Sequence, residues 1–432
     1  MSRKKQSENK SVESMEGKPL DALSVLKLGK DVGLTLMRDN TYANVSNWLP
    51  TGIPQYDRIL GGGIPFGRVT EIFGKKASGK STFALALSKQ ASDLDVVTVW
   101  IDVEGTSDIN RLRQLGIDDE RVYSIQPEFN PKTNMVDPLT VEIIGEKIEN
   151  LLKVFRDNSP DTPLLIIWDS IAATSSKVEM ESDYDSERPG LKAKSLAKFF
   201  NKVTPLINGY NVALVCINQA RDVMGGSFGH GDNIDSPGGK ALEHVVSLQL
   251  LVNQVDASKF NQKKPTSASQ YGDYVGHNMQ VTTKKSKVSR PNQKAKAFIA
   301  SEYELDDGTE INGFDSMVNF AMSADNNKVL DSRGSWKVFV DKHGQEHKKY
   351  MKDWTMFFYY NEDPELIEEI VGRTYFKMFQ KGYPAFDNKL IDVTNKLGMT
   401  ELKRLFDEQE ANESASSQAE ESEVTTDGST EE

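Results

Sequence analysis

The sequence predicts an α/β fold, in which a mainly parallel central sheet is covered by helices on both faces. Two observations support this fold class. Four apolar runs have the length of strands and lack the polar alternation of a half-exposed sheet; they cover residues 68–73, 96–101, 164–168 and 212–217. Segments with a helical period separate these runs, most clearly residues 139–155, where one face collects Ile144, Ile148, Leu151 and Phe155.

The later apolar runs follow one another without helices between them, so we expect them to join the sheet as antiparallel additions. They cover residues 245–252, 277–283 and 295–301. Beyond residue 306 the apolar runs become aromatic. Residues 336–340 and 354–360 are predicted as strands, and a helix is expected to begin near Pro364.

These changes of pattern divide the chain into parts. Residues 20–50 contain too few apolar residues for a core of their own, so we expect this segment to pack against the body or a neighbouring subunit. The predicted parts are a disordered arm (1–19), a polymerisation segment (20–50), an α/β core (51–305), a small α+β C-terminal domain (306–406) and an acidic disordered tail (407–432).

Composition excludes several classes of protein. The 432 residues carry a formal net charge of −12, but residues 407–432 alone hold ten acidic residues and no lysine or arginine. The body is therefore nearly neutral, and any surface that binds anions must be local. The single cysteine, Cys216, excludes an internal disulfide and a multi-cysteine zinc site. No apolar run is long enough for a signal peptide or membrane span, so we expect a cytoplasmic protein without a membrane partner.

The strongest local signal is a phosphate loop of the form G-x4-G-K-[ST] between a predicted strand and a predicted helix. The glycines let backbone N–H groups converge on phosphate oxygens, and the helix N-terminus adds partial positive charge. Lys80 is expected to reach the β- and γ-phosphates, Ser81 to ligate Mg²⁺ and Thr82 to lie near the α-phosphate. The predicted nucleotide-binding residues here are Gly74, Lys75, Lys76, Ala77, Ser78, Gly79, Lys80, Ser81 and Thr82.

Two carboxylates follow predicted strands and complete this site. Asp169 ends the apolar run 164–168, where it can hold the water shell of a phosphate-bound Mg²⁺. Glu104 follows the run 96–101 and is our candidate for the base that orients and deprotonates the attacking water. Asp102 lies closer to that strand and is expected to support the site.

At this point the chain resembles the RecA-type recombinase family. The motifs that carry the resemblance lie at residues 50–53, 57–68, 101–104, 169–173 and 217–219, within a matching region of about 45–303. The region from Gly313 onward is similar to the large recombinases of T4-type bacteriophages. The resemblance implies a RecA-like phosphate-loop ATPase core, ATP and Mg²⁺ as cofactors, and a location in the bacterial cytosol or nucleoid, with a phage gene as one origin.

The resemblance also implies an activity. The family forms ATP-driven helical filaments on single-stranded DNA, pairs them with homologous duplex DNA and exchanges strands in recombination and repair. Single-strand-binding and mediator proteins are further partners that this implies. An N-terminal arm would dock on the adjacent subunit, and such heterologous, non-closing contacts generate a filament.

Several residue roles are carried over from the family. Lys80 and Glu104 match its catalytic lysine and glutamate, and Asp169 its magnesium-side aspartate. Gln219 matches the glutamine that senses the γ-phosphate and relays its presence to a DNA-binding loop.

Two further pairs of residues match the family at the edge of this site. Asp108 matches an adenine-side contact, and Arg111 stands where an aromatic residue often stacks on the base. Lys285 and Lys287 match a pair that reaches across the subunit interface to the next protomer's γ-phosphate.

Two loops are predicted to bind DNA, at residues 181–194 and 221–240. The second loop is rich in glycine but also acidic at Asp222, Asp232 and Asp235, so backbone amides are expected to carry part of the phosphate contact. The acidic tail either competes with DNA for basic surfaces or serves solubility. The predicted DNA-binding residues are Arg188, Lys192, Lys194, Lys198, Arg221, Met224, Gly225, Gly226, Gly239 and Lys240.

Other functions remain open from the sequence alone. A ring-forming helicase-like motor could use the same fold, and processive duplex unwinding would distinguish it. A mediator paralogue could bind nucleotide without exchanging strands, although a scaffold has no need for Lys80, Glu104 and Gln219 together. A nucleotide-regulated kinase or clock-type ATPase would lack the glycine-rich loop after Gln219.

Overall fold

The computed structural model divides the chain into two units, residues 1–44 and 45–432. All of the described residues belong to the second unit. They are residues 45, 47–105, 108–115, 117–182, 190–208, 210–222, 234–237, 239–255, 276–300, 321–322, 329–359, 362–379, 404–405, 408 and 411–412.

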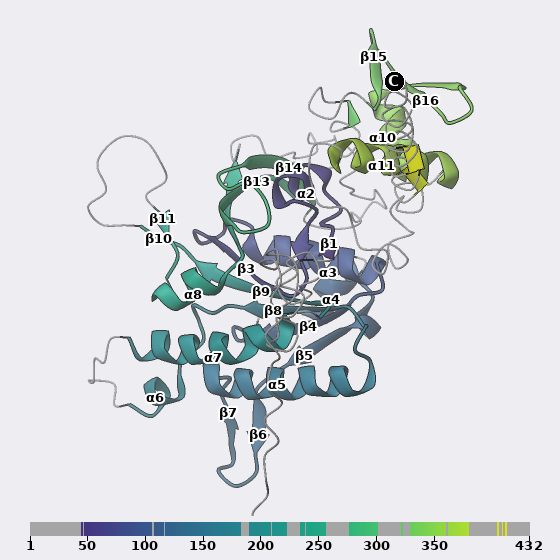
Figure 1. Ribbon diagram of the computed structural model, residues 1–432. Helices are drawn as coiled ribbons and strands as arrows, with labels where there is room; N and C mark the ends of the chain where they lie inside the picture. The colour runs from purple at the N-terminus through teal and green to yellow at the C-terminus, as the bar shows by residue number, and fades with distance from the viewer. Residues whose placement is uncertain are drawn as a thin grey trace, which may run out of the picture. The chain divides into compact units, whose positions relative to one another are not determined.

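An eight-stranded sheet forms the centre of this unit, with the strand order β14-β13-β12-β3-β9-β8-β4-β5 (Figure 1). The strands from β12 to β5 run parallel to their neighbours, whereas β13 and β14 pair antiparallel. The predicted α/β fold class is therefore confirmed. The strands are β3 (Arg68–Gly74), β4 (Val97–Asp102), β5 (Val122–Ile125), β8 (Leu164–Asp169), β9 (Val212–Gln219), β12 (Leu248–Val255), β13 (Gly276–Ser286) and β14 (Lys294–Ala300).

The prediction that the run 245–252 joins as an antiparallel addition was wrong. Strand β12 pairs parallel with β3, with Leu248 opposite Thr70. The reason is helix α8 (Gly239–Val245), which precedes β12 and lies in the crossover from β9 to β12. A parallel neighbour requires a crossover of this kind, and the glycine-rich sequence before it concealed the helix.

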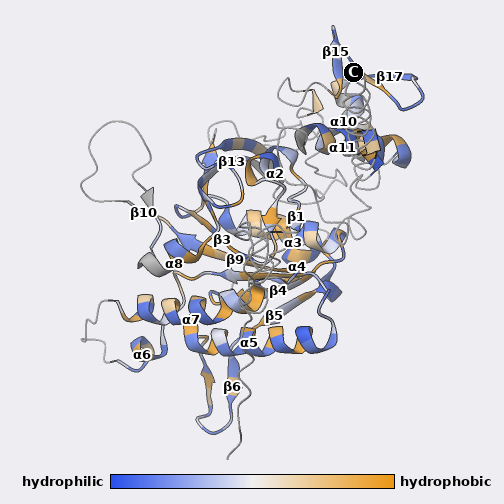
Figure 2. Cartoon of the chain, in the orientation of Figure 1, coloured by the Kyte–Doolittle hydropathy of each residue, from blue (hydrophilic) through white to orange (hydrophobic). Residues whose placement is uncertain are grey.

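Helices cover both faces of the sheet because successive strand residues point to opposite sides. Ile167 belongs to one apolar cluster with residues of α3 (Lys80–Asp93), while Ile166 belongs to another with residues of α5 (Val141–Asn158) and α7 (Leu191–Ile207). Figure 1 shows α3 on one side of the sheet and α5 and α7 on the other. In Figure 2, α5 and α7 carry both orange and blue segments, as expected for helices with one buried face.

A smaller three-stranded sheet and two helices follow in the sequence: β15 (Asp331–Arg333), β16 (Trp336–Val340), β17 (Glu346–Tyr350), α10 (Met351–Tyr359) and α11 (Pro364–Phe379). The predicted strand 336–340 and the helix near Pro364 are confirmed. The predicted strand 354–360 was wrong, because residues 354–359 lie in α10. Trp354, Phe357 and Phe358 are spaced by three and four, which places all three on the buried face of a helix.

This smaller region is joined to the sequence that precedes the central sheet. Trp48 lies in the same apolar cluster as Phe339 and Trp354. The Tyr375 hydroxyl donates a hydrogen bond of 2.7 Å to Asp57 Oδ2. The remaining elements are β1 (Trp48–Leu49), α2 (Pro54–Leu60), β2 (Ile64–Pro65), α4 (Ile109–Gln114), the 3-10 helix Asp119–Arg121, β6 (Glu128–Asn130), β7 (Met135–Asp137), α6 (Lys177–Met180), β10 (Arg221–Asp222) and β11 (Ile234–Asp235).

Within the part of the chain that the structure describes, no helix combines the length and the apolar character needed to cross a membrane.

Candidate functional site

The phosphate loop connects β3 to α3. Gly79 caps the helix with φ 94°, a left-handed conformation that favours glycine. A Cβ added to Gly74 would collide with Ser78 Oγ and with the backbone oxygen of Val252, so the turn leaves room for backbone only. Lys80 then begins the helix, and its first backbone N–H groups are available for anions.

The strand register brings the predicted polar residues to one edge of the sheet. Gly74 of β3 lies opposite Gln219 of β9, and Asp102 of β4 lies opposite Asp169 of β8. These four strands are neighbours and run parallel, so their carboxyl ends meet at the same edge. This is the edge at which open α/β sheets bind ligands.

Ser81 and Asp169 are in direct contact at this edge. The Ser81 hydroxyl donates a hydrogen bond of 2.9 Å to Asp169 Oδ2. Burial raises the pKa of the Asp169 carboxyl from 3.8 to about 6, while the Ser81 hydrogen bond opposes the rise and the charge of Glu104 adds to it. A hydroxyl and a carboxylate so placed are the ligands that Mg²⁺ takes beside a bound phosphate.

Lys80 lies over the loop beside these acids. Its ammonium donates a hydrogen bond of 2.8 Å to the backbone oxygen of Lys75. Burial lowers the pKa of Lys80, and the charges of Asp169 and Glu104 oppose that shift. The side chain is therefore a partly desolvated cation next to the position predicted for phosphates.

Glu104 lies in the turn that follows β4, and the structure gives it a partner that sequence reasoning missed. The Ser170 hydroxyl donates a hydrogen bond of 2.9 Å to Glu104 Oε1. Asp102 accepts a hydrogen bond of 2.8 Å from the backbone N–H of Gly105, which stabilises this turn, and its support of the site stays a prediction.

A buried network next to Gln219 was also missed. Glu71 of β3 is fully buried and accepts hydrogen bonds of 2.9 Å from Asn218 Nδ2 and from Gln249 Nε2. Asn218 Nδ2 donates in addition to Ser236 Oγ at 2.9 Å, and Asn218 Oδ1 accepts from the Gln219 backbone N–H at 3.0 Å. A glutamate inside an apolar strand was the sequence signal that could have revealed this network.

The two predicted adenine-side residues lie at α4. Asp108 is the N-cap of this helix and accepts a hydrogen bond of 3.0 Å from the Asn110 backbone N–H. Arg111 is half-buried one turn later. The N-cap hydrogen bond accounts for an aspartate at position 108 whether or not a nucleotide binds, so the contact of Asp108 with adenine stays a prediction.

Comparison with known proteins identifies the family of this chain. Residues 22–304, more than half of the chain, match the family described as RecA N-terminal domain. The chain belongs to the RecA family. This confirms the resemblance found in the sequence and assigns the chain to the RecA-type recombinases of DNA recombination and repair. The similarity to T4-type phage recombinases stays a prediction.

The relatives cover most of the chain and most of their own length. Protein RecA of Aquifex aeolicus (strain VF5) is 31% identical over 323 residues, which cover 74% of this chain and 81% of the relative. Protein RecA of Thermus aquaticus is 31% identical over 324 residues, covering 74% and 83%. Protein RecA of Campylobacter jejuni (strain 81-176) is 27% identical over 324 residues, covering 74% and 81%.

In the RecA-family core of this chain, Lys285 and Lys287 lie beside the end of α8. The Lys285 ammonium donates to the backbone oxygen of Glu243, and the Lys287 ammonium donates to that of His244 at 2.9 Å. Burial, together with the positive charges of Lys285 and Arg68, lowers the pKa of Lys287. Cations at a helix C-terminus are favourable within one chain, so a role across a subunit interface stays a prediction.

Six of the ten predicted DNA-binding residues lie among the described residues. Lys194 and Lys198 are exposed and one turn apart on α7, and Arg221 is exposed on β10. Lys192 is less available, because its ammonium donates a hydrogen bond of 2.6 Å to the backbone oxygen of Ala172. The backbones of Gly239 and Lys240 open α8, so the second loop is shorter than predicted. The others, Arg188, Met224, Gly225 and Gly226, lie outside the described residues.

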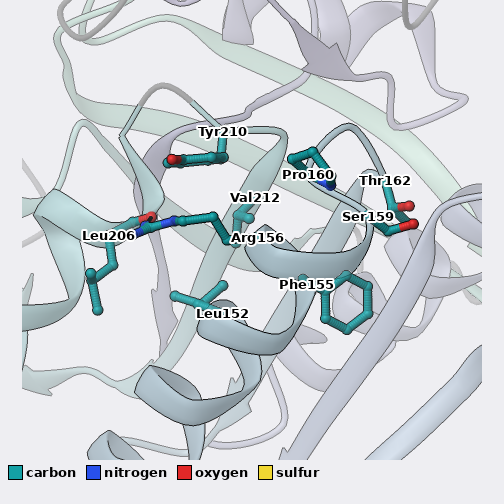
Figure 3. Close-up of a pocket in the computed structure, with 9 residues that line it drawn as sticks. All are labelled: Leu152, Phe155, Arg156, Ser159, Pro160, Thr162, Leu206, Tyr210 and Val212. Carbon is teal, nitrogen blue, oxygen red and sulfur yellow. Dashed lines mark hydrogen bonds between the residues drawn. The ribbon is translucent and has the colours of Figure 1, made fainter.

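A pocket lies at the opposite ends of the strands, where α5 ends and β9 begins (Figure 3). The Arg156 guanidinium stacks 4.5 Å from the centre of the Tyr210 ring and donates a hydrogen bond of 3.0 Å to the backbone oxygen of Leu206. Val212 lines this pocket at the start of β9, whereas Gln219 ends the same strand. The pocket is therefore separate from the nucleotide site, and we interpret it as packing between α5 and α7.

Proposed function

We propose that the chain is a DNA-dependent ATPase that forms a helical filament on single-stranded DNA and catalyses homologous pairing and strand exchange. The observation that carries this proposal is the contact between Ser81 and Asp169 beside the phosphate loop, in a chain of the RecA family. A loop, a cation and paired magnesium ligands at one sheet edge are the parts that phosphoryl transfer requires.

The residues of this edge fit ATP and Mg²⁺. The turn at Gly74 admits backbone only, as a phosphate cradle requires, and Lys80 supplies positive charge above it. Ser81 would ligate the metal directly, while Asp169 would hold it through water. Bound Mg²⁺ would neutralise charge that develops on the phosphate oxygens.

Two residues would act on the γ-phosphate end. Glu104 is proposed to orient a water molecule and accept its proton. Gln219, in register with Gly74, is proposed to hydrogen-bond the γ-phosphate and to transmit its presence to the segment that follows β9. Asp108 and Arg111 would contact the adenine.

We further propose that Lys194, Lys198 and Arg221 bind the DNA backbone, together with Arg188, Lys192, Met224, Gly225, Gly226, Gly239 and Lys240. Binding through phosphates would weaken as salt rises. Lys285 and Lys287 would reach the γ-phosphate of the next protomer, which couples hydrolysis to assembly. The protein would work in the cytosol with single-strand-binding and mediator proteins.

The predicted division of the chain belongs to the same proposal. Residues 1–19 and 407–432 would form polar arms, and residues 20–50 would carry polymerisation. Residues 51–305 would form the ATPase core, and 306–406 a small C-terminal domain.

The experiment that tests the proposal is joint-molecule formation between circular single-stranded DNA and homologous linear duplex, with and without ATP. We expect joint molecules only with ATP and homologous DNA, accompanied by hydrolysis that single-stranded DNA stimulates. Processive unwinding of the duplex without pairing would favour a helicase-like motor instead. Nucleotide binding without either activity would favour a mediator.

A further inference from the structure

Ser170 directly follows Asp169, the magnesium-side aspartate, in the sequence. Asp169 contacts Ser81 on one side, and Ser170 contacts Glu104 on the other. One turn at the end of β8 thus touches both the proposed metal ligand and the proposed base. We infer that Ser170 is a positioning residue that fixes the Glu104 carboxylate toward the attacking water; this inference rests on the proposed function.

Neighbouring groups fix the direction in which the Ser170 hydroxyl donates its proton. Ser170 is 1% exposed, and its Oγ accepts a hydrogen bond of 3.2 Å from the backbone N–H of Ala173. A hydroxyl has one proton to donate. Because Ala173 occupies an acceptor position of Oγ, that proton is directed to Glu104 Oε1 at 2.9 Å.

The backbone around Ser170 is fixed as well. Its carbonyl accepts a hydrogen bond of 2.8 Å from the buried Thr174 hydroxyl, which in turn accepts one of 2.8 Å from Trp168 Nε1. The N–H of Ile171 donates to the backbone oxygen of Ile217 in β9, and the N–H of Val103 donates to that of Asp169, each at 2.9 Å. Ser170 is therefore anchored to both neighbouring strands.

Glu104 needs such an anchor because it lies on an exposed turn. A glutamate there has several rotatable bonds and loses rotamer entropy when it is held in one orientation. The Ser170 hydroxyl engages Oε1, and we assign Oε2 to the proton of the attacking water. Pre-orienting the base in this way lowers the cost of reaching a reactive geometry.

The test compares ATP hydrolysis, with single-stranded DNA present, in the wild type and in Ser170→Ala, Ser170→Thr, Glu104→Gln and the double variant Ser170→Ala/Glu104→Gln. In Ser170→Ala we expect kcat to fall about tenfold, because the base is misoriented but present. The KM for ATP and the measured affinity for ATP should change less than about twofold. Ser170→Thr keeps the hydroxyl and should restore most of kcat.

The double variant separates positioning from structural damage. If Ser170 acts through Glu104, Ser170→Ala should cause no further loss once Glu104→Gln is present. Ser176→Ala is the matched control, since Ser176 is a buried serine whose hydroxyl caps α6 through Glu179 and does not contact Glu104. It should lower thermal stability while it leaves kcat unchanged.

The possible outcomes are distinguishable. Three results would overturn the role of Ser170 and leave the proposed function intact. They are an unchanged kcat in Ser170→Ala, a rise in its KM as large as the fall in its kcat, or a fall in kcat that is equally large in the wild-type and Glu104→Gln backgrounds. Wild-type protein that does not hydrolyse ATP would overturn the proposed function, and the role of Ser170 with it.

Discussion

Ser81 and Asp169 are 88 positions apart in the sequence, yet their side chains meet at 2.9 Å. The contact joins the first turn of α3 to the end of β8, so it aligns the helix that follows the phosphate loop with this strand. It also places the carboxyl of Asp169 beside the position proposed for a divalent cation. Burial raises the pKa of this carboxyl to about 6.

We expect the affinity for Mg²⁺–ATP to fall below pH 6. Asp169 holds the water shell of Mg²⁺ in its charged form, and protonation removes that charge as the pH falls through its pKa of about 6. The fall should approach about tenfold per pH unit below pH 6. Titration of nucleotide binding at several pH values measures it. The variant Asp169→Asn should bind weakly without this dependence, and the same slope in that variant would assign it to another group.

Lys80→Ala is expected to abolish ATP hydrolysis and to weaken ATP binding by at least about tenfold, because Lys80 supplies the cation above the phosphate loop. Steady-state hydrolysis and equilibrium nucleotide binding measure the two effects. Lys89→Ala is the control. Lys89 lies on the same helix and pairs with Asp93, on a stretch of α3 beyond the phosphate loop. Equal losses in both variants would mean that helix stability, and not the charge of Lys80, was responsible.

The proposed role of Lys285 and Lys287 across the subunit interface can be tested by mixing. One variant lacks both lysines, and the other carries Glu104→Gln; each alone should hydrolyse ATP much more slowly than the wild type. In random equimolar filaments, about a quarter of the sites would pair an intact Glu104 with intact lysines from the next subunit, and turnover should reappear at about that level. A mixture as inactive as its components would show that each subunit uses its own lysines.

Removing the buried Glu71 carboxylate should be costly. Glu71→Ala leaves the Gln249 amide without this acceptor and removes one acceptor of the Asn218 amide, so we expect a loss of about 2–4 kcal/mol in the free energy of unfolding. Gln249→Ala removes one of these hydrogen bonds and should cost about 1 kcal/mol. Urea unfolding compares the two. Similar small losses in both variants would show that the network rearranges around another acceptor.

Local signals explain which parts of this molecule could be predicted. The phosphate loop and the strand that ends at Asp169 depend on residues within about ten positions of each other, so their pattern predicts them. The orientation of β12 depends on the distant strand β3, and Trp354 lies in an aromatic run that suits a strand as well as a helix. The contact of Ser170 with Glu104 joins positions 66 apart, and only the sheet register brings them together.

Asp57 gives a prediction about stability and pH. Its carboxyl is fully buried and accepts hydrogen bonds of 2.7 Å from the Thr51 backbone N–H, from the Thr51 hydroxyl and from Tyr375. Burial raises its pKa from 3.8 to about 7. The protonated form is therefore favoured in the folded state. The contribution of the protonated Asp57 carboxyl to the free energy of unfolding is fully present below pH 3.8 and is lost as the pH rises through about 7.

The variant Asp57→Asn should remove this dependence, because an amide keeps the shape and an acceptor oxygen but does not titrate. Between pH 5 and pH 6 the wild type should lose about 1.4 kcal/mol of unfolding free energy relative to the variant. Urea unfolding of both proteins across this range measures the difference, in which the titration of every other group cancels. A constant difference between the two proteins would mean that Asp57 is already charged throughout this range, and that its three hydrogen bonds outweigh the cost of burial.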